Sequence, residues 1–400
     1  MGREGEVVKE LLPAFRERYP GVRVEVQQIP WTAAHEKLLT AFVGESLPDV
    51  AQIGNTWLPE FQTLGALEDL GPRVARSSVI AAKSYFPGIW DTNLVEGVLC
   101  GVPWYVDTRV LFYRKDLLKA AGVDAPPRTW AEWRDALRRL RARAGPGRWA
   151  ILLPTDEWAQ PVILGLQNGA SLLTADGGDA AFRSPAFREA ATFYVDLFRE
   201  GFAPPVANTQ ISNLYQQFAA GDFAMYITGP WNLGEFRRRL PASLKDSWAT
   251  APLPSAAGGV PGVHGVPGVS LAGGSSLVLF RTSKRSEDAW KLIEFLSEPA
   301  QQVRFYALAG DLPARRDAWL DPILSGDAEA RAFEAQLENV AAAPRIPEWE
   351  QIAQKIAEHL EPAIRGVVTV DTALLALDKD VSGLLTKRRW VLARKAAHAR

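Results

Sequence analysis

The sequence contains few of the residues that build disulfides, metal sites or membrane-spanning helices. Its only cysteine, Cys100, cannot form an internal disulfide, and its neighbours Leu99 and Gly101 favour a small buried residue over an activated thiol. No stretch of about eighteen apolar residues occurs, so we expect no transmembrane helix. The histidines are scattered without the spacing of metal ligands, and we therefore expect no metal and no cofactor. They are His35, His264, His359 and His398.

The sequence also lacks an excess of charge of either sign. Its 45 basic and 46 acidic side chains give a net charge of −1, which disfavours nucleic acid and anionic lipid as partners. What it does have is length and apolar content, because 400 residues exceed one hydrophobic core and 47% are apolar. Two lobes are expected. The 14 tryptophans exceed the usual number; many of them must be core residues, and a binding cleft lined with aromatic rings would also raise the count.

The stretch Phe218–Phe236 is the most informative part of the chain. We predict that a helix ends at Gly221, that Phe223–Thr228 forms a strand, and that the Gly229-Pro230 turn places Trp231 in the loop before the next helix. Open α/β sheets bind ligands beyond the carboxyl ends of their strands, so Trp231 is a candidate ligand contact. The alternative is that its ring packs under the following helix.

The first fifty residues alternate between predicted helices and strands. Val7–Phe15 and Trp31–Phe42 have helical spacing of apolar residues, whereas Val22–Val26 and Pro48–Ile53 have the pattern of strands. This order predicts a parallel sheet. The Gly- and Pro-rich connection 252–274 is longer than a simple turn, and we expect it to be functional.

Several motifs in series resemble family 1 extracellular solute-binding proteins, the maltose-binding-protein-like receptors that deliver sugars to ABC importers. They are PDVAQIGNTW at Pro48–Trp57, GVPWYVDTRVLFYRKD at Gly101–Asp116, FAAGDFAMYITGPW at Phe218–Trp231, SEDAWKLIEFLSEPAQQ at Ser286–Gln302 and GDLPARRD at Gly310–Asp317. The resemblance implies an α/β, two-lobe periplasmic-binding-protein-like (type II) fold whose hinge closes an interlobe cleft around the ligand. Lobe one would hold 1–107 and 276–312, and lobe two would hold 108–275 and 313–400.

In the resembled family a strand precedes the first helix and lies in the sheet of lobe one. Here that first strand and a signal peptide both appear to be missing ahead of Val7. A misassigned start codon, a trimmed chain or a true truncation would each explain this. The first two are favoured because an empty strand position leaves backbone groups unpaired.

The resemblance also implies a set of ligand-binding residues, with aromatic rings as stacking faces and polar side chains as partners for vicinal hydroxyls. Each residue also has a structural alternative. Asp107 could cap a helix or form hydrogen bonds to the backbone of the hinge, and Tyr105 could be a core residue. Glu157 could be a carboxylate at the start of a helix, where the helix dipole favours negative charge. Gly273 and Gly274 would let backbone approach the ligand. The set is Trp31, Asn55, Trp57, Tyr105 and Asp107, then Glu157, Trp158, Tyr226, Trp231 and Asn232, and finally Gly273, Gly274, Arg345 and Trp349.

The function implied is that of a non-enzymatic, monomeric sugar receptor, periplasmic or extracellular and membrane-associated, whose partner is the permease of an ABC transporter. A receptor for a non-sugar solute, such as a polyamine or a glycerol phosphate, is an alternative. The polyamine is considered because aromatic rings with Asp107 and Glu157 could hold a cation. A glycoside hydrolase is a more distant alternative. It would need two carboxyl groups on either side of the bond, drawn from Asp107, Asp156 and Glu157.

Overall fold

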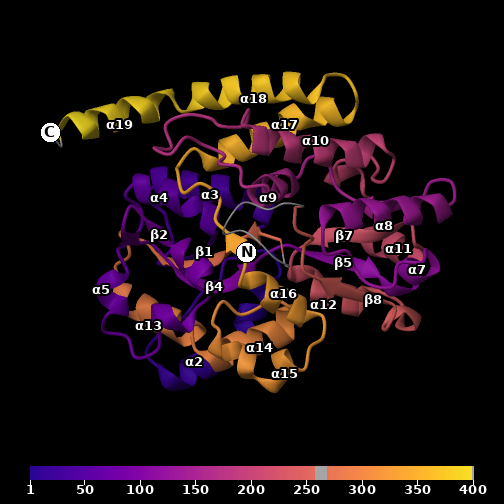
Figure 1. The fold of residues 1–400 in the computed structure, drawn as a ribbon. Coiled ribbons are helices and arrows are strands. Elements are labelled where there is room, and N and C mark those ends of the chain that lie inside the picture. Colours follow the sequence, from indigo (N-terminus) through magenta and orange to yellow (C-terminus); the bar gives the residue numbers. More distant parts are fainter. Residues whose placement is uncertain (257–267, 399–400) are drawn as a thin grey trace. The chain divides into compact units, whose positions relative to one another are not determined.

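The computed structural model describes residues 1–256 and 268–398 (Figure 1). The chain divides into two compact units. Unit 1 comprises Met1–Thr108, Gly229–Glu235 and Ala272–Arg331, and unit 2 comprises Arg109–Thr228, Phe236–Leu271 and Ala332–Arg400. Most of the long connection expected at 252–274 lies outside the described residues.

Unit 1 is built around an antiparallel sheet in the order β1-β10-β4. The strands of unit 1 are β1 Val50–Gly54, β4 Val102–Asp107 and β10 Gly273–Leu279 of this sheet, and β2 Leu94–Val95 and β3 Val98–Leu99, which form a separate pair. Its helices are α1 Glu4–Val7, α2 Leu12–Arg18, α3 Trp31–Val43, α4 Leu58–Thr63, α5 Gly71–Val74, α6 Pro87–Asp91, α13 Ser286–Leu296, α14 Pro299–Ala309 and α15 Pro322–Ser325. Helices α12 Trp231–Arg239 and α16 Ala330–Leu337 each begin in unit 1 and end in unit 2.

Two predictions for this part of the chain are wrong. The sheet is not parallel, because β10, which arrives from far along the chain, runs between β1 and β4 in the opposite direction to both. Val22–Val26 is extended but pairs with no strand in the described residues. Its apolar residues are half-buried and its charged residues are exposed. An unpaired segment with one face turned toward the protein therefore shows the same alternation as a strand.

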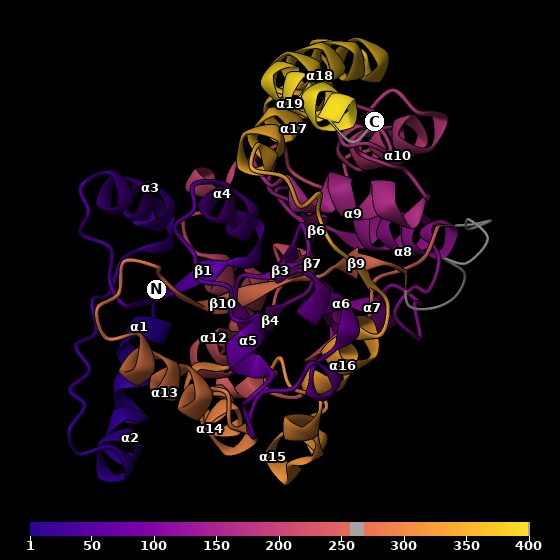
Figure 2. The same cartoon turned by 90° about the vertical axis from the view of Figure 1, so that its left-hand side faces the viewer.

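Helices from distant parts of the chain pack together in unit 1. Phe15 of α2 contacts Phe295 of α13 edge to face, with ring centroids 5.4 Å apart. Arg18 pairs with Glu298, just before α14. Figure 2 shows α2, α13 and α14 as neighbours at one end of the unit. Cys100 is buried, and burial raises the pKa of its thiol to about 12, which matches the inert cysteine expected.

Unit 2 is built around a mixed sheet in the order β6-β7-β5-β8, in which only β6 and β7 are parallel. The strands of unit 2 are β5 Val110–Arg114, β6 Trp149–Leu152, β7 Phe223–Thr228 and β8 Trp248–Ala251 of this sheet, and β9 Ser270–Leu271 and β11 Val340–Ala341, which form a separate pair. Its helices are α7 Lys115–Ala120, α8 Trp130–Arg143, α9 Ala159–Gln167, α10 Pro185–Arg199, α11 Leu214–Ala220, α17 Trp349–Ile364, α18 Val370–Leu384 and α19 Thr386–His398.

The Phe218–Phe236 segment folds as predicted, except that Trp231 is the first residue of the next helix and not part of the loop before it. Helix α11 ends at Ala220 and Gly221 caps it with a left-handed φ of 74°, after which β7 covers the predicted strand. Helix α12 begins at Trp231. Phe218 and Phe236, at the two ends of the segment, are fully buried and their rings lie 4.9 Å apart. The apolar ends of the segment therefore anchor β7 in the core of unit 2.

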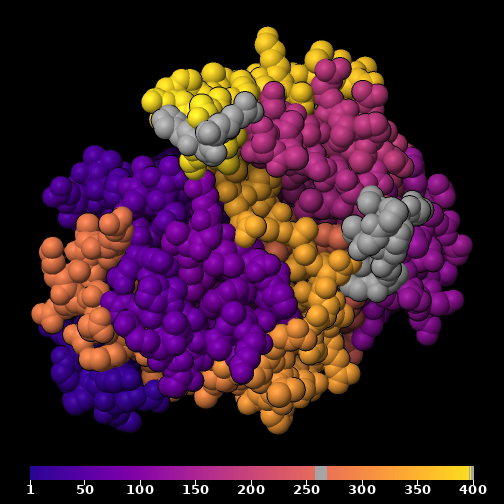
Figure 3. Space-filling model, turned by 60° about the vertical axis from the view of Figure 1, so that its left-hand side comes forward, coloured from indigo at the N-terminus to yellow at the C-terminus, as the bar shows by residue number. Residues whose placement is uncertain are grey.

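The C-terminal helices cover one side of unit 2. Helices α17 and α18 pack against each other and both contact α10. Figure 3 shows their side chains, with those of α19, as a continuous yellow surface beside residues of α10. Within the described residues, no helix has both the length and the apolar character needed to cross a membrane.

Candidate functional site

Two tryptophans of unit 1 pack together at the ends of a helix and a strand. Trp31 opens α3, and Trp57 follows β1 in a short 3₁₀ turn. Their rings meet edge to face at 5.5 Å, and His35 covers Trp57 at 5.0 Å. Trp57 is only 9% exposed, whereas Trp31 is partly buried. Trp31 is therefore the more accessible ring of the pair.

Tyr105 is the centre of a buried hydrogen-bond network in unit 1. Its hydroxyl donates to Glu4 Oε1 at 2.9 Å and accepts from Gln52 Nε2 at 2.7 Å, while Ser275 Oγ lies 3.0 Å away. Trp31 Nε1 donates to the same Glu4 oxygen at 3.2 Å. Burial, with Asp311 and Glu4 nearby, raises the pKa of Tyr105 well above its ordinary value. The phenol therefore stays protonated and links the aromatic pair to the acidic residues.

Asp107 and the two glycines lie where β4 and β10 pair. Gly273 pairs with Asp107 and Gly274 with Val106. A Cβ on Gly273 would lie 2.2 Å from the Asp107 carbonyl oxygen, and one on Gly274 would lie 2.5 Å from that of Tyr105. The close approach of the two strands thus accounts for both glycines. Asn55 supports the end of the same strand, since its Nδ2 donates to the Ala272 carbonyl at 2.8 Å.

Trp231 and Asn232 begin α12 and belong to unit 1. Trp231 is 37% exposed, whereas Asn232 is buried. The Trp231 ring lies over Gly229 so closely that a Cβ there would be 1.9 Å from its Cζ3. Glycine at 229 is therefore needed for this position of the ring. Glu235, one turn later, pairs with Arg3 at 3.7 Å.

The predicted residues of unit 2 form two groups. In the first, Asn208 Nδ2 donates to Asp156 Oδ1 at 3.0 Å and to Glu157 Oε1 at 3.2 Å, which fixes the loop after β6. Tyr226 belongs to this group, because burial raises the pKa of its phenol and the Glu157 carboxylate adds to that effect. Arg109 lies near enough to act in the opposite direction.

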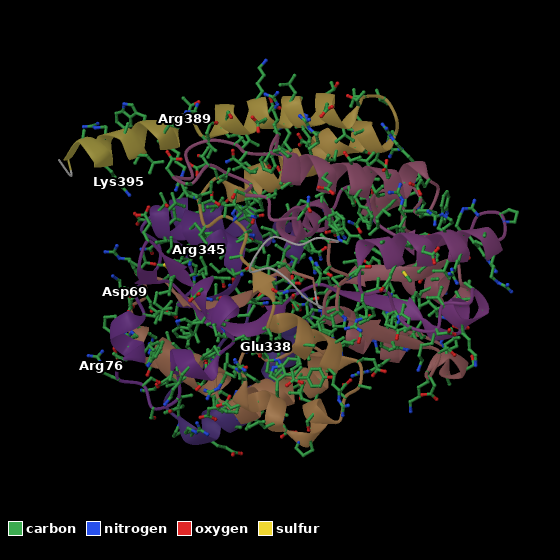
Figure 4. The ribbon with its side chains drawn as sticks, in the orientation of Figure 1. Asp69, Arg76, Glu338, Arg345, Arg389 and Lys395 are labelled. Carbon is green, nitrogen blue, oxygen red and sulfur yellow. The ribbon has the colours of Figure 1, made fainter. Side chains whose placement is uncertain are left out.

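The second group of unit 2 is the aromatic pair of Trp158 and Trp349. Trp158 meets Trp349 edge to face at 5.4 Å. Trp349 is fully buried, so Trp158 is the ring of this pair that a ligand could contact. Arg345 is exposed and lies on the loop that leads from α16 to α17, where Figure 4 labels it.

Sequence reasoning missed several polar residues that lie among the predicted ones. Glu4 and Gln52 bond directly to Tyr105, and Asn208 bonds to Glu157. Asp311 is buried beside Glu4 and Asp107. Of these, Gln52 and Asp311 had a signal in the sequence, because they lie within the PDVAQIGNTW and GDLPARRD motifs. The described residues include no cluster of histidine, cysteine and carboxylate side chains suited to a metal ion.

A comparison with known protein families identifies the family of this chain. The profile described as bacterial extracellular solute-binding protein matches residues 2–303. The chain belongs to this family. Its members are extracellular receptors, and the two-lobe type II fold is confirmed by similar solved structures. One is the sugar-binding protein MalE from Xanthomonas citri, with a TM-score of 0.91 and 48% identity, covering 98% of each chain.

Two further relatives of this solute-binding protein show the range of the similarity. The maltose-bound MalE3 of T. maritima has a TM-score of 0.81 at 26% identity, covering 96% of this chain and 97% of that one. The diacetylchitobiose binding protein DasA of Streptomyces coelicolor is 27% identical over 375 residues, 92% of this chain and 82% of DasA. Both are named for the sugars they bind.

Proposed function

We propose that this solute-binding protein binds a mono- or oligosaccharide and delivers it, chemically unchanged, to the permease of an ABC importer. The observation that carries the proposal is the similarity to a sugar-binding protein at 48% identity over 98% of both chains. The side chains support it. Aromatic rings cover the apolar faces of sugars, and carboxylates, amides and phenols bond to their hydroxyls.

Within this proposal, each unit has its own candidate residues for sugar contact. In unit 1 the candidates are Trp31, Trp231 and the polar residues linked through Tyr105, which combine a ring with acceptors. In unit 2 they are Trp158, Tyr226 and Glu157. Asn55, Asn232, Trp57 and Trp349 are buried, so we assign them the task of holding the exposed residues in place.

We also propose that the receptor acts as a monomer outside the cell and that its lobes span 1–107 with 276–312 and 108–275 with 313–400. The compact units differ from these ranges mainly at Gly229–Glu235 and 313–331, which pack with unit 1. Trp231 would then be contributed to lobe one by a segment that leaves lobe two and returns to it.

Isothermal titration calorimetry with a panel of solutes tests the function. The panel comprises maltose, N,N′-diacetylchitobiose, D-tagatose, glycerol 3-phosphate and spermidine. We expect micromolar binding of at least one sugar and no binding of the phosphate or the polyamine. Binding of only the last two would contradict the proposal. The release of reducing ends from maltose during overnight incubation would contradict the assignment as a receptor without catalysis.

A further inference from the structure

Helix α19 carries basic side chains and no acidic one. Its cations are Lys387, Arg388, Arg389, Arg394 and Lys395. Helices α17 and α18, which precede it, have the opposite balance. They contain the carboxylates of Glu350, Glu358, Glu361, Asp371, Asp378 and Asp380 and the amines of Lys355 and Lys379. The near-neutral charge of the chain as a whole, which argues against an anionic partner, therefore conceals a positive charge that is concentrated on α19.

Two of these cations hold α19 against other parts of unit 2. Arg388 Nε donates to the Gly177 carbonyl at 2.9 Å, and the same guanidinium pairs with Glu348 at 3.8 Å. Arg389 pairs with Asp179 at 3.4 Å. All of these partners belong to unit 2. Figure 4 labels Arg389 and, further along the helix, Lys395. The contacts of the two arginines fix which side of α19 is turned toward the protein.

Another face of α19 is exposed and combines cations with apolar side chains. Trp390 is 58% exposed and Val391 is 37% exposed. Lys387, Arg394 and Lys395 are exposed as well, and the Arg394 guanidinium lies over the Trp390 ring at 4.6 Å. At 100° per residue, these five positions span about 140° of the helix, so they share one face.

A face of this composition is suited to the surface of an anionic bilayer. Lysine and arginine are attracted to lipid phosphates, and tryptophan prefers the boundary between head groups and acyl chains. With 13 residues, α19 is shorter than the roughly 20 needed to cross a bilayer, so it can only lie along the surface.

Two other uses of the exposed face account for less of what it contains. A nucleic acid matches its charge but offers no apolar layer to Val391 and Trp390. Solubility alone explains exposed cations, but it does not call for an exposed indole among them. The combination of both kinds of side chain on one face therefore favours a lipid surface.

We propose that the exposed face of α19, formed by Lys387, Trp390, Val391, Arg394 and Lys395, binds the surface of a bilayer that contains anionic phospholipid. This binding is separate from sugar recognition, because none of these residues is a candidate sugar contact. If the proposed receptor function also holds, a receptor kept at the bilayer in this way searches for its permease along the membrane and not through the surrounding volume.

Co-sedimentation of the full chain with lipid vesicles tests the proposal. One set of vesicles is made of dioleoyl phosphatidylcholine, and the other contains about one third of dioleoyl phosphatidylglycerol. We expect at least about tenfold stronger binding to the anionic vesicles, and the difference should disappear in about 0.5 M NaCl, which screens the attraction. Equal binding to both sets, or binding to neither, would overturn the proposal.

Variants of the exposed face separate the contributions of charge and ring. The triple variant Lys387→Gln/Arg394→Gln/Lys395→Gln should bind anionic vesicles about 100-fold more weakly, since three attractive charges are lost. Trp390→Ala should bind about tenfold more weakly, because the ring no longer enters the interface. These side chains are exposed, so the melting temperature followed by circular dichroism should stay that of wild type.

The matched control is Arg138→Gln/Arg139→Gln/Arg143→Gln, which removes the same charge from exposed positions of α8. It should bind anionic vesicles as wild type does. If it weakens binding as much as the α19 triple variant, the attraction is a general effect of charge and α19 is not the lipid surface. Binding of a DNA duplex as tight as that of anionic vesicles would likewise overturn the assignment to lipid.

Calorimetry with the solute panel keeps this inference distinct from the sugar-receptor function. The α19 triple variant should bind sugar with wild-type affinity while its vesicle binding is lost. A fall in its sugar affinity would contradict a lipid surface separate from the sugar site. Absence of sugar binding by the wild type would overturn the proposed function and not the lipid surface.

Discussion

Trp231 and Trp57 differ in how much of each ring a ligand could reach. Trp57 is 9% exposed, with Trp31 and His35 packed against it, whereas Trp231 is 37% exposed and rests on the backbone of Gly229. Because a stacking ring must offer one open face, Trp231 suits direct contact with a sugar. Trp57 suits the support of Trp31.

Replacing Trp231 with alanine should weaken sugar binding about 30-fold, or about 2 kcal/mol, since the stacking face is lost. The melting temperature should change little, because the ring is already partly exposed. Calorimetry measures the affinity. The control is Trp390→Ala, which removes an exposed tryptophan of α19. Unaltered affinity in Trp231→Ala would remove this residue from the site.

Gly273→Ala should destabilise the protein by about 3 kcal/mol, because the new Cβ would overlap the Asp107 carbonyl oxygen and a backbone atom cannot turn away. Urea denaturation gives this value. The matched variant is Gly383→Ala in α18, where nothing lies within 4 Å of the added methyl group. It should stabilise the helix by up to about 1 kcal/mol. Equal effects of the two variants would show that the β4 and β10 backbones can separate.

Among single elements, the local sequence predicts α11, β7 and α12. Their attachment to β5 depends on a residue from another part of the chain. Arg114, at the end of β5, donates to the carbonyls of Phe218 and Ala219 at 2.7 and 3.1 Å. These are carbonyls of the last turn of α11, where a cation is favoured. The same guanidinium forms a two-bond pair with Asp116 in α7. One buried arginine therefore joins a strand to two helices.

Arg114→Met should cost about 2 to 3 kcal/mol in the free energy of unfolding at neutral pH, because buried carbonyls lose their donor. The bond from Arg114 holds the pKa of Asp116 below its usual value. The pair therefore stabilises the protein above pH of about 4, and this part is lost as the pH falls through the folded pKa. The difference between variant and wild type should narrow on going from pH 6 to pH 3.

Urea denaturation at each pH provides the measurement for Arg114→Met. Arg138→Met is the control, since Arg138 lies on the exposed face of α8 and, among the residues that the structure describes, pairs only with Asp135 at 3.5 Å. It should change stability by less than about 0.5 kcal/mol. A difference between Arg114→Met and wild type that widens toward pH 3 would contradict the assigned role of the ion pair.

At the scale of the whole molecule, each unit has its own sheet and its own hydrophobic core. Neither core depends on a disulfide, since the lone cysteine is buried and free. A ligand that binds the folded protein and not the unfolded chain adds to the stability of the protein. The chain crosses between the units several times.

A sugar present at 100 times its dissociation constant should stabilise the protein by about 2.7 kcal/mol, which raises the melting temperature of a chain of this length by about 3 °C. Differential scanning fluorimetry across the solute panel measures the shift. A sugar that gives no heat in calorimetry should give no shift. A similar rise with every sugar, including those that do not bind, would mean a general effect of the co-solvent.

The class of fold and the local elements were predictable from the amino-acid sequence. The Gly221 cap, the β7 strand and the start of α12 at Trp231 depend on residues within a few positions of one another. The family likeness likewise came from short motifs, and the profile match and the solved relatives confirm it. Local propensity and motif order suffice for such features, because the interactions that create them are close in sequence.

Which distant residues contact one another became clear from the three-dimensional fold and not from the sequence. The antiparallel position of β10, the grouping of Trp231 with unit 1 and the packing of Trp349 against Trp158 all depend on segments far apart in the sequence. The same holds for Asp311, whose neighbour Glu4 comes from the other end of unit 1. Burial and electrostatic environment are properties of packed surroundings, and periodicity in a sequence carries no record of which distant side chains supply them.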